Sequence, residues 1–179
     1  MTRRLIPLLF LFVPVPASAD DCRAVDGARG SVSFEVRQAG SPFRGMFRGF
    51  GGEICFTQDR VTRIDVWLHP ATVDTGLPEV DAALKETEFF AVKEFPRLAF
   101  ASTSVEAREG RQLAHGALHI KGKGHNLDVP FRLQQEEGRW VVSGSLTLDR
   151  LRYGIGTGEW SDTRWLGAEV KVVFRAALR

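Results

Sequence analysis

The sequence lacks the features that mark most enzymes and nucleic-acid-binding proteins. It contains no G-x-S-x-G nucleophile elbow, no nucleophile beside an evident base and no phosphate-binding glycine loop in a strand–helix setting. The chain has 24 basic and 22 acidic residues, and two of the basic ones lie in the first 19 positions, so the remainder is formally neutral. A neutral balance gives no electrostatic reason to expect a nucleic acid or an anionic membrane as a partner. These absences argue against an enzyme and against a nucleic-acid-binding protein.

The chain also has little continuous apolar sequence, and the one extended run lies at its start. Two arginines precede the run Leu5–Val13, and the small residues A-S-A follow at 17–19. This pattern predicts a secretory signal peptide over residues 1–19. A run of about nine residues is too short to span a bilayer as a helix, and Cys22 lacks the preceding pattern of a lipoprotein signal. We therefore expect a free periplasmic protein that consists of one domain, residues 20–179.

Cysteine is scarce as well. Cys22 and Cys55 are the two cysteines, and they do not form a C-x-x-C motif. In an exported protein such a pair predicts a disulfide, and for a loop of about 33 residues chain-entropy models give roughly 3–4 kcal/mol of stabilisation. Two unpaired buried thiols are the alternative, and the missing C-x-x-C argues against a catalytic thiol.

Alternation of apolar and polar residues dominates the sequence from Ser31 onward. The segment Ser31–Arg37, for example, places Val32, Phe34 and Val36 on one face. Eight strands are predicted in this way: Ser31–Arg37, Phe47–Phe56, Val61–His69, Leu98–Val105, Leu113–Lys121, Leu127–Leu133, Arg139–Leu148 and Val170–Ala176. Short, glycine-rich connections favour antiparallel neighbours, so the predicted fold is an all-β, up-and-down, eight-stranded barrel, with a sandwich as the alternative.

The stretch Asp81–Phe100 departs from this alternation. It begins with the helix formers Ala82–Glu86 and continues with four phenylalanines, among which Pro96 prevents the helix from continuing. We expect a short helix between the third and fourth predicted strands, followed by an aromatic cover over an apolar interior. An eight-stranded barrel can hold either a packed core or one slender ligand.

The histidines and the polar C-terminal segment offer weaker candidates for chemistry. His115 and His119 have H-x-x-x-H spacing, but on a strand they lie about 13 Å apart, so no metal site is expected. Asp149 and Arg150 are expected to form an ion pair that anchors a turn. The glycine-rich run 154–158 has no strand–helix setting and is expected to be a flexible turn.

Several motifs, taken in order, resemble the YceI family of exported lipocalin-like proteins. They are S-V-S-F at 31–34, F-R-G-M-F-R-G-F at 43–50, V-D-T-G at 73–76, F-F at 89–90, F-P at 95–96, G-A-L-H-I at 116–120, V-P-F at 129–131 and D-R-L-R-Y-G-I at 149–155. The resemblance covers essentially all of the predicted mature chain. It implies an antiparallel eight-stranded barrel with a helical segment near one end, and a hydrophobic tunnel that holds a long polyisoprenoid chain such as an isoprenoid quinone or a polyprenyl phosphate. The family includes homodimers.

Two further features resemble a subgroup found alongside, or fused to, cytochrome b561 membrane proteins. These are the pair Cys22 and Cys55 and the sequence G-T-G-E-W at 156–160. This resemblance implies a quinone or electron-transfer context by analogy. Glu159 and Trp160 are candidates for shaping the barrel mouth.

The alternation of apolar and polar residues along the strands and the resemblance to the YceI family together predict which residues line the tunnel. The candidate ligand-binding residues are Val32, Phe34, Val36, Phe47, Ile64, Val66, Phe89, Phe90, Phe95, Phe100, Leu118, Ile120, Phe131, Leu146 and Leu148. The first hypothesis is a periplasmic carrier of an isoprenoid lipid that requires no cofactor. The second is an accessory protein to a membrane cytochrome, with an exposed patch around Trp67, Trp160 and Trp165. An enzyme that acts on a bound lipid is the third.

Overall fold

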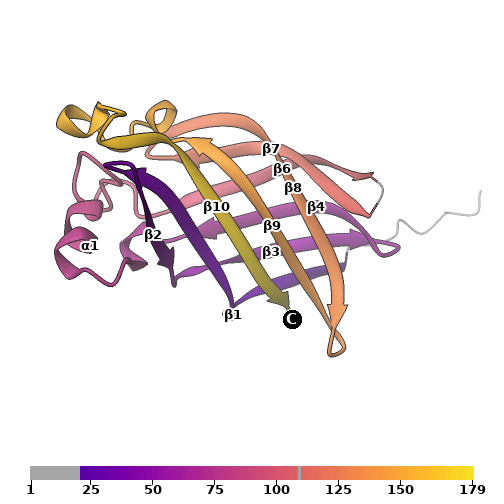
Figure 1. Ribbon diagram of the computed structural model, residues 1–179. Helices are drawn as coiled ribbons and strands as arrows, with labels where there is room; N and C mark the ends of the chain where they lie inside the picture. Colours follow the sequence, from indigo (N-terminus) through magenta and orange to yellow (C-terminus); the bar gives the residue numbers. More distant parts are fainter. Residues whose placement is uncertain (1–20, 109) are drawn as a thin grey trace, which may run out of the picture.

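The protein folds into a closed antiparallel β-barrel with a short helix at one end (Figure 1). The computed structural model describes residues 21–108 and 110–179, so the predicted signal peptide lies outside the described residues. Within these ranges the strands are β1 (Asp21–Gln38), β2 (Ser41–Phe47), β3 (Phe50–Thr57), β4 (Arg60–Leu68), β5 (Val73–Asp74), β6 (Leu98–Arg108), β7 (Arg111–Ile120), β8 (Lys123–Glu136), β9 (Arg139–Asp149) and β10 (Leu166–Leu178).

The ten strands occupy eight strand positions around the barrel. The strands β2 and β3 act as one kinked strand, because both pair with β1: β2 with its second half, Val32–Gln38, and β3 with its first residues, Asp21–Ala24. The two-residue β5 adds only to the outer edge of β2. Pairing of β1 with β10 closes the sheet. The predicted eight-stranded antiparallel barrel is therefore confirmed.

Two predicted strands begin at the wrong place by six residues or more. The first strand begins at Asp21 and not at Ser31, because residues 21–24 pair with β3 even though their sequence shows no alternation. The second begins at Ser41 and not at Phe47, and the chain leaves the sheet at Arg48 and Gly49 before β3 starts. The other six predicted strands each overlap an observed strand.

The predicted disulfide is confirmed. Cys22 and Cys55 are directly opposite each other on β1 and β3, and their sulfur atoms are bonded. Near them the two ends of the described chain also meet: Ala24 and Arg179 exchange two backbone hydrogen bonds, of 3.1 and 3.0 Å. One end of the barrel is thus fixed by both a covalent bond and the β1–β10 seam.

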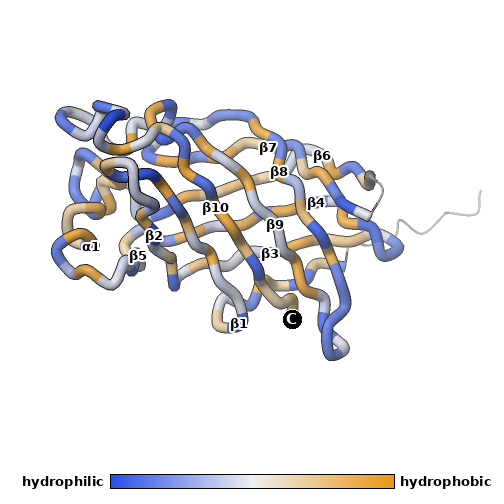
Figure 2. The backbone as a smooth tube through the Cα atoms, in the orientation of Figure 1, coloured by the Kyte–Doolittle hydropathy of each residue, from blue (hydrophilic) through white to orange (hydrophobic). Residues whose placement is uncertain are grey.

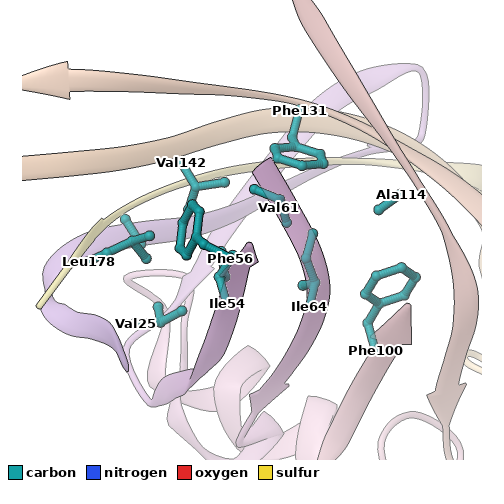
Figure 3. Packing of buried hydrophobic residues seen from close by; sticks show 11 residues of the cluster. Val25, Ile54, Phe56, Val61, Ile64, Phe100, Ala114, Phe131, Val142 and Leu178 are labelled. Atoms are coloured by element: carbon teal, nitrogen blue, oxygen red, sulfur yellow. The ribbon is translucent and has the colours of Figure 1, made fainter. Parts of the chain in front are cut away.

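The same end contains the packed core (Figure 3). Hydrophobic and hydrophilic residues alternate along the strands (Figure 2). The inward residues near the turn at 57–60, the first residues of β7 and the turn at 136–139 pack against one another. The members of this core are Val25, Ile54, Phe56, Val61, Ile64, Phe100, Ala114, Phe131, Val142, Ala176 and Leu178. Burial of these side chains from opposite walls stabilises the closed end of the barrel.

The helix α1 (Pro78–Lys85) lies at the other end (Figure 1). It begins four residues before the predicted start at Ala82, with Pro78 in its first turn and Glu79 and Asp81 beside the free amides of that turn. The Asp81 carboxylate also accepts hydrogen bonds from the Thr75 amide and hydroxyl, at 2.8 and 2.7 Å. No described helix is long and apolar enough to cross a membrane.

Candidate functional site

An apolar cavity of about 430 Å³ occupies the barrel between the packed core and α1. Its volume is in the range of small-molecule binding pockets. The inward faces of the strands supply nearly all of its wall, and Val80, Ala83 and Leu84 of α1 supply part of its cover. The sequence folds in this way because each strand alternates, so one face of every strand is available to line the bore.

The cavity brings together fourteen of the fifteen side chains predicted to bind a ligand. These are Val32, Phe34, Val36, Phe47, Ile64, Val66, Phe89, Phe90, Phe100, Leu118, Ile120, Phe131, Leu146 and Leu148. Phe95 is not among the described residues that line it: its ring lies over Gly122 in the turn between β7 and β8, where a Cβ atom on Gly122 would approach within 2.9 Å. Contact of the fourteen with a ligand stays a prediction.

Several lining residues were not predicted. Val170, Val172 and Phe174 of β10 line the cavity, and their alternation is visible in the sequence of that strand. Two uncharged polar side chains, Gln38 and Tyr153, also reach the wall. Tyr153 belongs to the motif at 149–155, but nothing in the sequence distinguishes Gln38 from a surface residue. Tyr153 is buried, and its burial raises the pKa of its hydroxyl.

Phenylalanine–glycine pairs keep the bore open. Phe34 is opposite Gly45 in the β1–β2 pairing, and Phe174 is opposite Gly144 in the β10–β9 pairing. In each pair a Cβ atom on the glycine would lie 2.5 Å from the phenyl Cζ atom. The ring therefore lies flat against the wall in the space that a side chain would fill, and does not project into the bore.

Two chain segments cover the cavity at the end opposite the core. The first runs from 75 to 97 and contains α1; the second connects β9 to β10 and contains the 3₁₀ turns η2 (Arg150–Tyr153) and η3 (Gly158–Ser161). Figure 1 shows both at the same end of the barrel. None of the α1 residues is buried, so the helix lies on the barrel mouth without packing deeply into it.

The two cover segments are joined to each other. The Gly156 and Thr157 amides donate to the Glu88 carbonyl, at 2.7 and 3.1 Å, and the ring centroids of Phe89 and Trp160 are 5.5 Å apart. Phe89 is buried in a small cluster with Val36 and Leu166. These contacts hold the glycine-rich run in place, so it is not the flexible turn that the sequence suggested.

Lys121 connects both segments to the barrel. From the β7–β8 turn its ammonium group donates to the carbonyls of Thr87 and, at 3.0 Å, of Gly154. Partial burial of the ammonium group lowers the pKa of Lys121. One side chain thus fixes both parts of the cover to the same strand end.

Arg150 has a structural role different from the predicted ion pair with Asp149. It is 3% exposed, and its five N–H groups donate to five backbone carbonyls, those of Ile155, Gly156, Trp160, Leu166 and Gly167, at 2.5–2.9 Å. Burial lowers the pKa of this guanidinium. Asp149 accepts a hydrogen bond from the Leu151 amide at 2.9 Å instead. The sequence could not show this arrangement, because it depends on how the connection to β10 curls around the side chain.

The histidines do not form a shared site. His115 lies on the outside of β7 between two carboxylates: its Nδ1 is 2.6 Å from Asp128 and its Nε2 is 3.3 Å from Glu106. His119 lies against Gly124 in the neighbouring strand. Of the residues described, only Cys22, Glu53 and Cys55 bring three potential metal-ligating atoms within 4.8 Å, and the two sulfurs there form the disulfide.

The three tryptophans proposed as an exposed patch have different environments. Trp160 and Trp165 are 39% and 64% exposed on the second cover segment. Trp67 is half-buried, with the Arg97 guanidinium 5.1 Å from its ring centroid and its ring against Gly51. Trp67 therefore does not contribute to an exposed surface as the other two do.

Comparison with known proteins identifies the family. The family model of the YceI-like domain matches residues 24–178. The chain belongs to the YceI family. This YceI protein is similar to a UPF0312 protein of Shewanella oneidensis, with 31% identity over 117 residues that cover 63% of this chain and 61% of that protein. A UPF0312 protein of Enterobacter sp. strain 638 is 27% identical over 171 residues, which cover 92% of this chain and 79% of the relative.

Solved structures share the fold. BcnA of Burkholderia cenocepacia superimposes with a TM-score of 0.81 at 27% identity, and the match covers 86% of this chain and 98% of BcnA. A polyisoprenoid-binding domain from Saccharophagus degradans superimposes with a TM-score of 0.72 at 14% identity, covering 88% of this chain and 97% of that domain. The family membership predicted from the sequence is confirmed. The link to cytochrome b561 stays a prediction.

Proposed function

We propose that this YceI protein is a periplasmic binding protein, without catalytic activity, that holds one long-chain isoprenoid lipid in its barrel. The observation that supports this function is the apolar cavity, which the packed core closes at one end and α1 covers at the other. A prenyl chain is long, thin and apolar, so a bore lined by alternate strand residues removes it from water along its length. The polyisoprenoid-binding domain from Saccharophagus degradans has the same fold.

The lipid tail would lie toward the core and the head group toward the cover. Each methylene of the tail that is buried contributes about 0.8 kcal/mol of transfer free energy to binding. The entropy lost on association and on ordering of the tail offsets part of the total. Release requires the tail to leave the bore through the covered end, because the side chains of the core fill the other end. We therefore expect slow release.

The charged side chains of the wall favour a neutral head group. Two arginines line the cavity, and both are already engaged: Arg150 donates to five carbonyls and Arg175 pairs with the Glu136 carboxylate. Burial of a phosphate without a free cation carries a large desolvation cost. Gln38 and Tyr153 offer an amide and a hydroxyl instead. A quinone-type head group thus fits this wall better than a polyprenyl phosphate.

Native mass spectrometry of the protein purified from its own periplasm, followed by lipid extraction, tests the proposal. We expect one isoprenoid lipid per chain, and uptake of added ubiquinone by the emptied protein. Replacement of Leu146, a lining residue, by tryptophan should abolish uptake, whereas the matched Val173→Trp on the outer face of β10 should not. A stoichiometric prenyl phosphate would overturn the head-group preference, and an apo protein that takes up neither lipid would overturn the carrier function.

Exposed tryptophans on the cover favour a second candidate function, as an accessory protein to a cytochrome b561-type membrane partner. Trp165 is 64% and Trp160 39% exposed, and tryptophan is enriched in protein interfaces. Crosslinking in the native membrane should then capture such a cytochrome, and Trp165→Ser should abolish the crosslink while lipid uptake persists. Capture of a second copy of the chain would instead show a homodimer.

A further inference from the structure

The disulfide lies at the core end of the barrel, and its two sulfurs differ in environment. Cys22 is exposed on the first residues of β1, whereas Cys55 is fully buried on β3. Thiol–disulfide exchange requires a thiolate to attack one sulfur along the bond axis while the other leaves. The geometry allows attack only on Cys22, and Cys55 is then the leaving group.

A guanidinium group lies beside the leaving sulfur. The Arg63 Nη2 atom is 3.2 Å from Cys55 Sγ and 3.9 Å from Cys22 Sγ. The Glu53 carboxylate, 2.6 Å from the same nitrogen, holds the guanidinium in this position. A cation next to a sulfur stabilises the thiolate over the thiol, and a better-stabilised thiolate is a faster leaving group.

The exposed sulfur borders a hollow on the surface. A polar depression of about 810 Å³ is lined by the ends of several strands, and Cys22, but not Cys55, is part of its wall. Its other residues are Asp21, Arg23, Asp59, Gln135, Gly138, Arg139, Trp140, Leu178 and Arg179. A partner polypeptide can therefore approach Cys22 without any change in the barrel.

We propose that Cys22–Cys55 is a thiol–disulfide exchange site that a dithiol protein of the thioredoxin class reduces. A thiolate of the partner attacks Cys22 Sγ and forms a mixed disulfide, and the electron pair of the broken bond passes to Cys55 Sγ, which leaves as a thiolate beside Arg63. The partner's second thiol, as its thiolate, then attacks the partner's own sulfur in the mixed disulfide and releases Cys22. Two electrons and two protons pass to this protein, and the partner becomes oxidised.

Reduction removes the covalent bond between β1 and β3 at this end of the barrel. The segment Asp21–Ala24 then remains attached only by non-covalent contacts: its strand pairing with β3, the Arg23 guanidinium 5.2 Å from the centroid of the Phe56 ring, and the hydrogen bonds between Ala24 and Arg179. The next residue, Val25, belongs to both the core and the cavity wall, so the segment released by reduction adjoins the closed end of the bore. This site is separate from the cover, and it does not depend on the proposed lipid.

Trapping of the mixed disulfide tests which sulfur is attacked. The oxidised protein is incubated with thioredoxin whose second active-site cysteine is replaced by serine, and the covalent product is mapped by peptide mass spectrometry. We expect the partner on Cys22. A product on Cys55, no product, or a reaction whose rate equals global unfolding and does not depend on thioredoxin concentration would each overturn the proposal.

The rate of reduction by wild-type thioredoxin tests the role of Arg63. Arg63→Gln should slow reduction roughly tenfold, because an adjacent cation lowers the pKa of a leaving thiol by about 1–3 units. Glu53→Gln should accelerate it, because this carboxylate lies within 4.8 Å of both sulfurs and disfavours a thiolate there, whereas the guanidinium remains near Asp65, 3.9 Å from Arg63 Nη1.

Arg44→Gln is the matched control for these two variants. Arg44 also pairs with a glutamate, Glu35, on the neighbouring strand, but it lies on β2, which pairs with the second half of β1 and not with the segment that carries Cys22. We expect this variant to be reduced at the wild-type rate. Equal rates in all four folded proteins would contradict the role of Arg63.

Discussion

The Gly156 amide donates a hydrogen bond of 2.7 Å to the Glu88 carbonyl, and this contact connects two segments that are far apart in the sequence. Both atoms belong to the backbone, so no change of side chain at Glu88 removes the bond directly. Around it, Phe89 packs near Trp160, and Lys121 binds both segments. The cover of the cavity is therefore one connected unit, and its opening requires these contacts to break together.

Removal of the Phe89 ring should loosen this unit. Phe89 is 7% exposed and touches both cover segments, so Phe89→Ala should lower the free energy of unfolding by about 3 kcal/mol and accelerate release of a bound lipid. Chemical denaturation and a transfer assay to lipid vesicles measure the two effects. Phe56→Ala is the control, because it removes a buried ring (4% exposed) from the core at the opposite end of the barrel that does not line the cavity, and it should leave the release rate unchanged although it also lowers stability. Equal release rates for both variants would contradict a gating role of Phe89.

Filling of the space behind a phenyl ring should narrow the bore. In Gly45→Ala the new Cβ would lie 2.5 Å from Phe34 Cζ and 2.9 Å from Thr75 Cγ2, so the ring must swing away from the wall. We expect a stability loss of about 1–3 kcal/mol from overpacking and weaker uptake of a prenyl lipid in a titration. Gly167→Ala on β10 is matched, because its nearest contact is an ordinary 3.4 Å. Unchanged uptake by Gly45→Ala would show that Phe34 does not limit the bore.

Arg150→Lys should destabilise the protein although the charge is kept. An ammonium group has three N–H donors, so at least two of the five carbonyls bound by Arg150 lose their partner. At about 1–3 kcal/mol for each unsatisfied buried acceptor, the expected loss is about 2–6 kcal/mol. Denaturant midpoints measure it. Stability equal to that of the wild type would show that water replaces the lost donors without cost.

The stability of the protein should depend on pH through His115. The hydrogen bond with Asp128 raises the pKa of His115, and the Glu106 carboxylate on β6 acts in the same direction, although partial burial opposes both. A raised pKa in the folded state means that the stabilisation is fully present below about pH 6.5, the value of an unfolded histidine, and is lost as the pH rises through the folded-state pKa. Thermal melts from pH 5 to 9 should show this loss in the wild type and in His119→Gln, but not in His115→Gln.

The sequence predicted the barrel wall well because alternation is a local property. Val32, Phe34 and Val36 show the inward face of β1 within five residues, and the observed cavity lies on that face. The barrel closure followed from the number of strands and the short connections between them. Phe89 and Phe90 also line the cavity, as predicted.

The cover could not be predicted in the same way, because its contacts join distant segments. Nothing near Arg150 in the sequence indicates that its partners are carbonyls as far on as Gly167. Phe95 lies in the same aromatic stretch as Phe89 and Phe90, yet its ring packs against Gly122 in the β7–β8 turn and not in the cavity. The start of β1 was missed for a related reason: residues 21–24 are held by β3 and the disulfide and not by an alternating pattern of their own.

The backbones of Ala24 and Arg179 are hydrogen-bonded to each other, so the first and last strands are neighbours in the barrel. The chain ends could therefore be moved to another turn by circular permutation without changing the order of the strands. A linker from Arg179 to Asp21, three residues before Ala24, would keep Cys22 and the pairing of residues 21–24 with β3. New ends could be opened at the exposed β8–β9 turn, where a Cβ atom on Gly138 would have no neighbour within 4 Å. Such a circular permutant would preserve every pairing of the sheet. Affinity tags or surface attachments placed at either the present or the permuted ends would then point away from α1, and the covered mouth would remain free to exchange its contents.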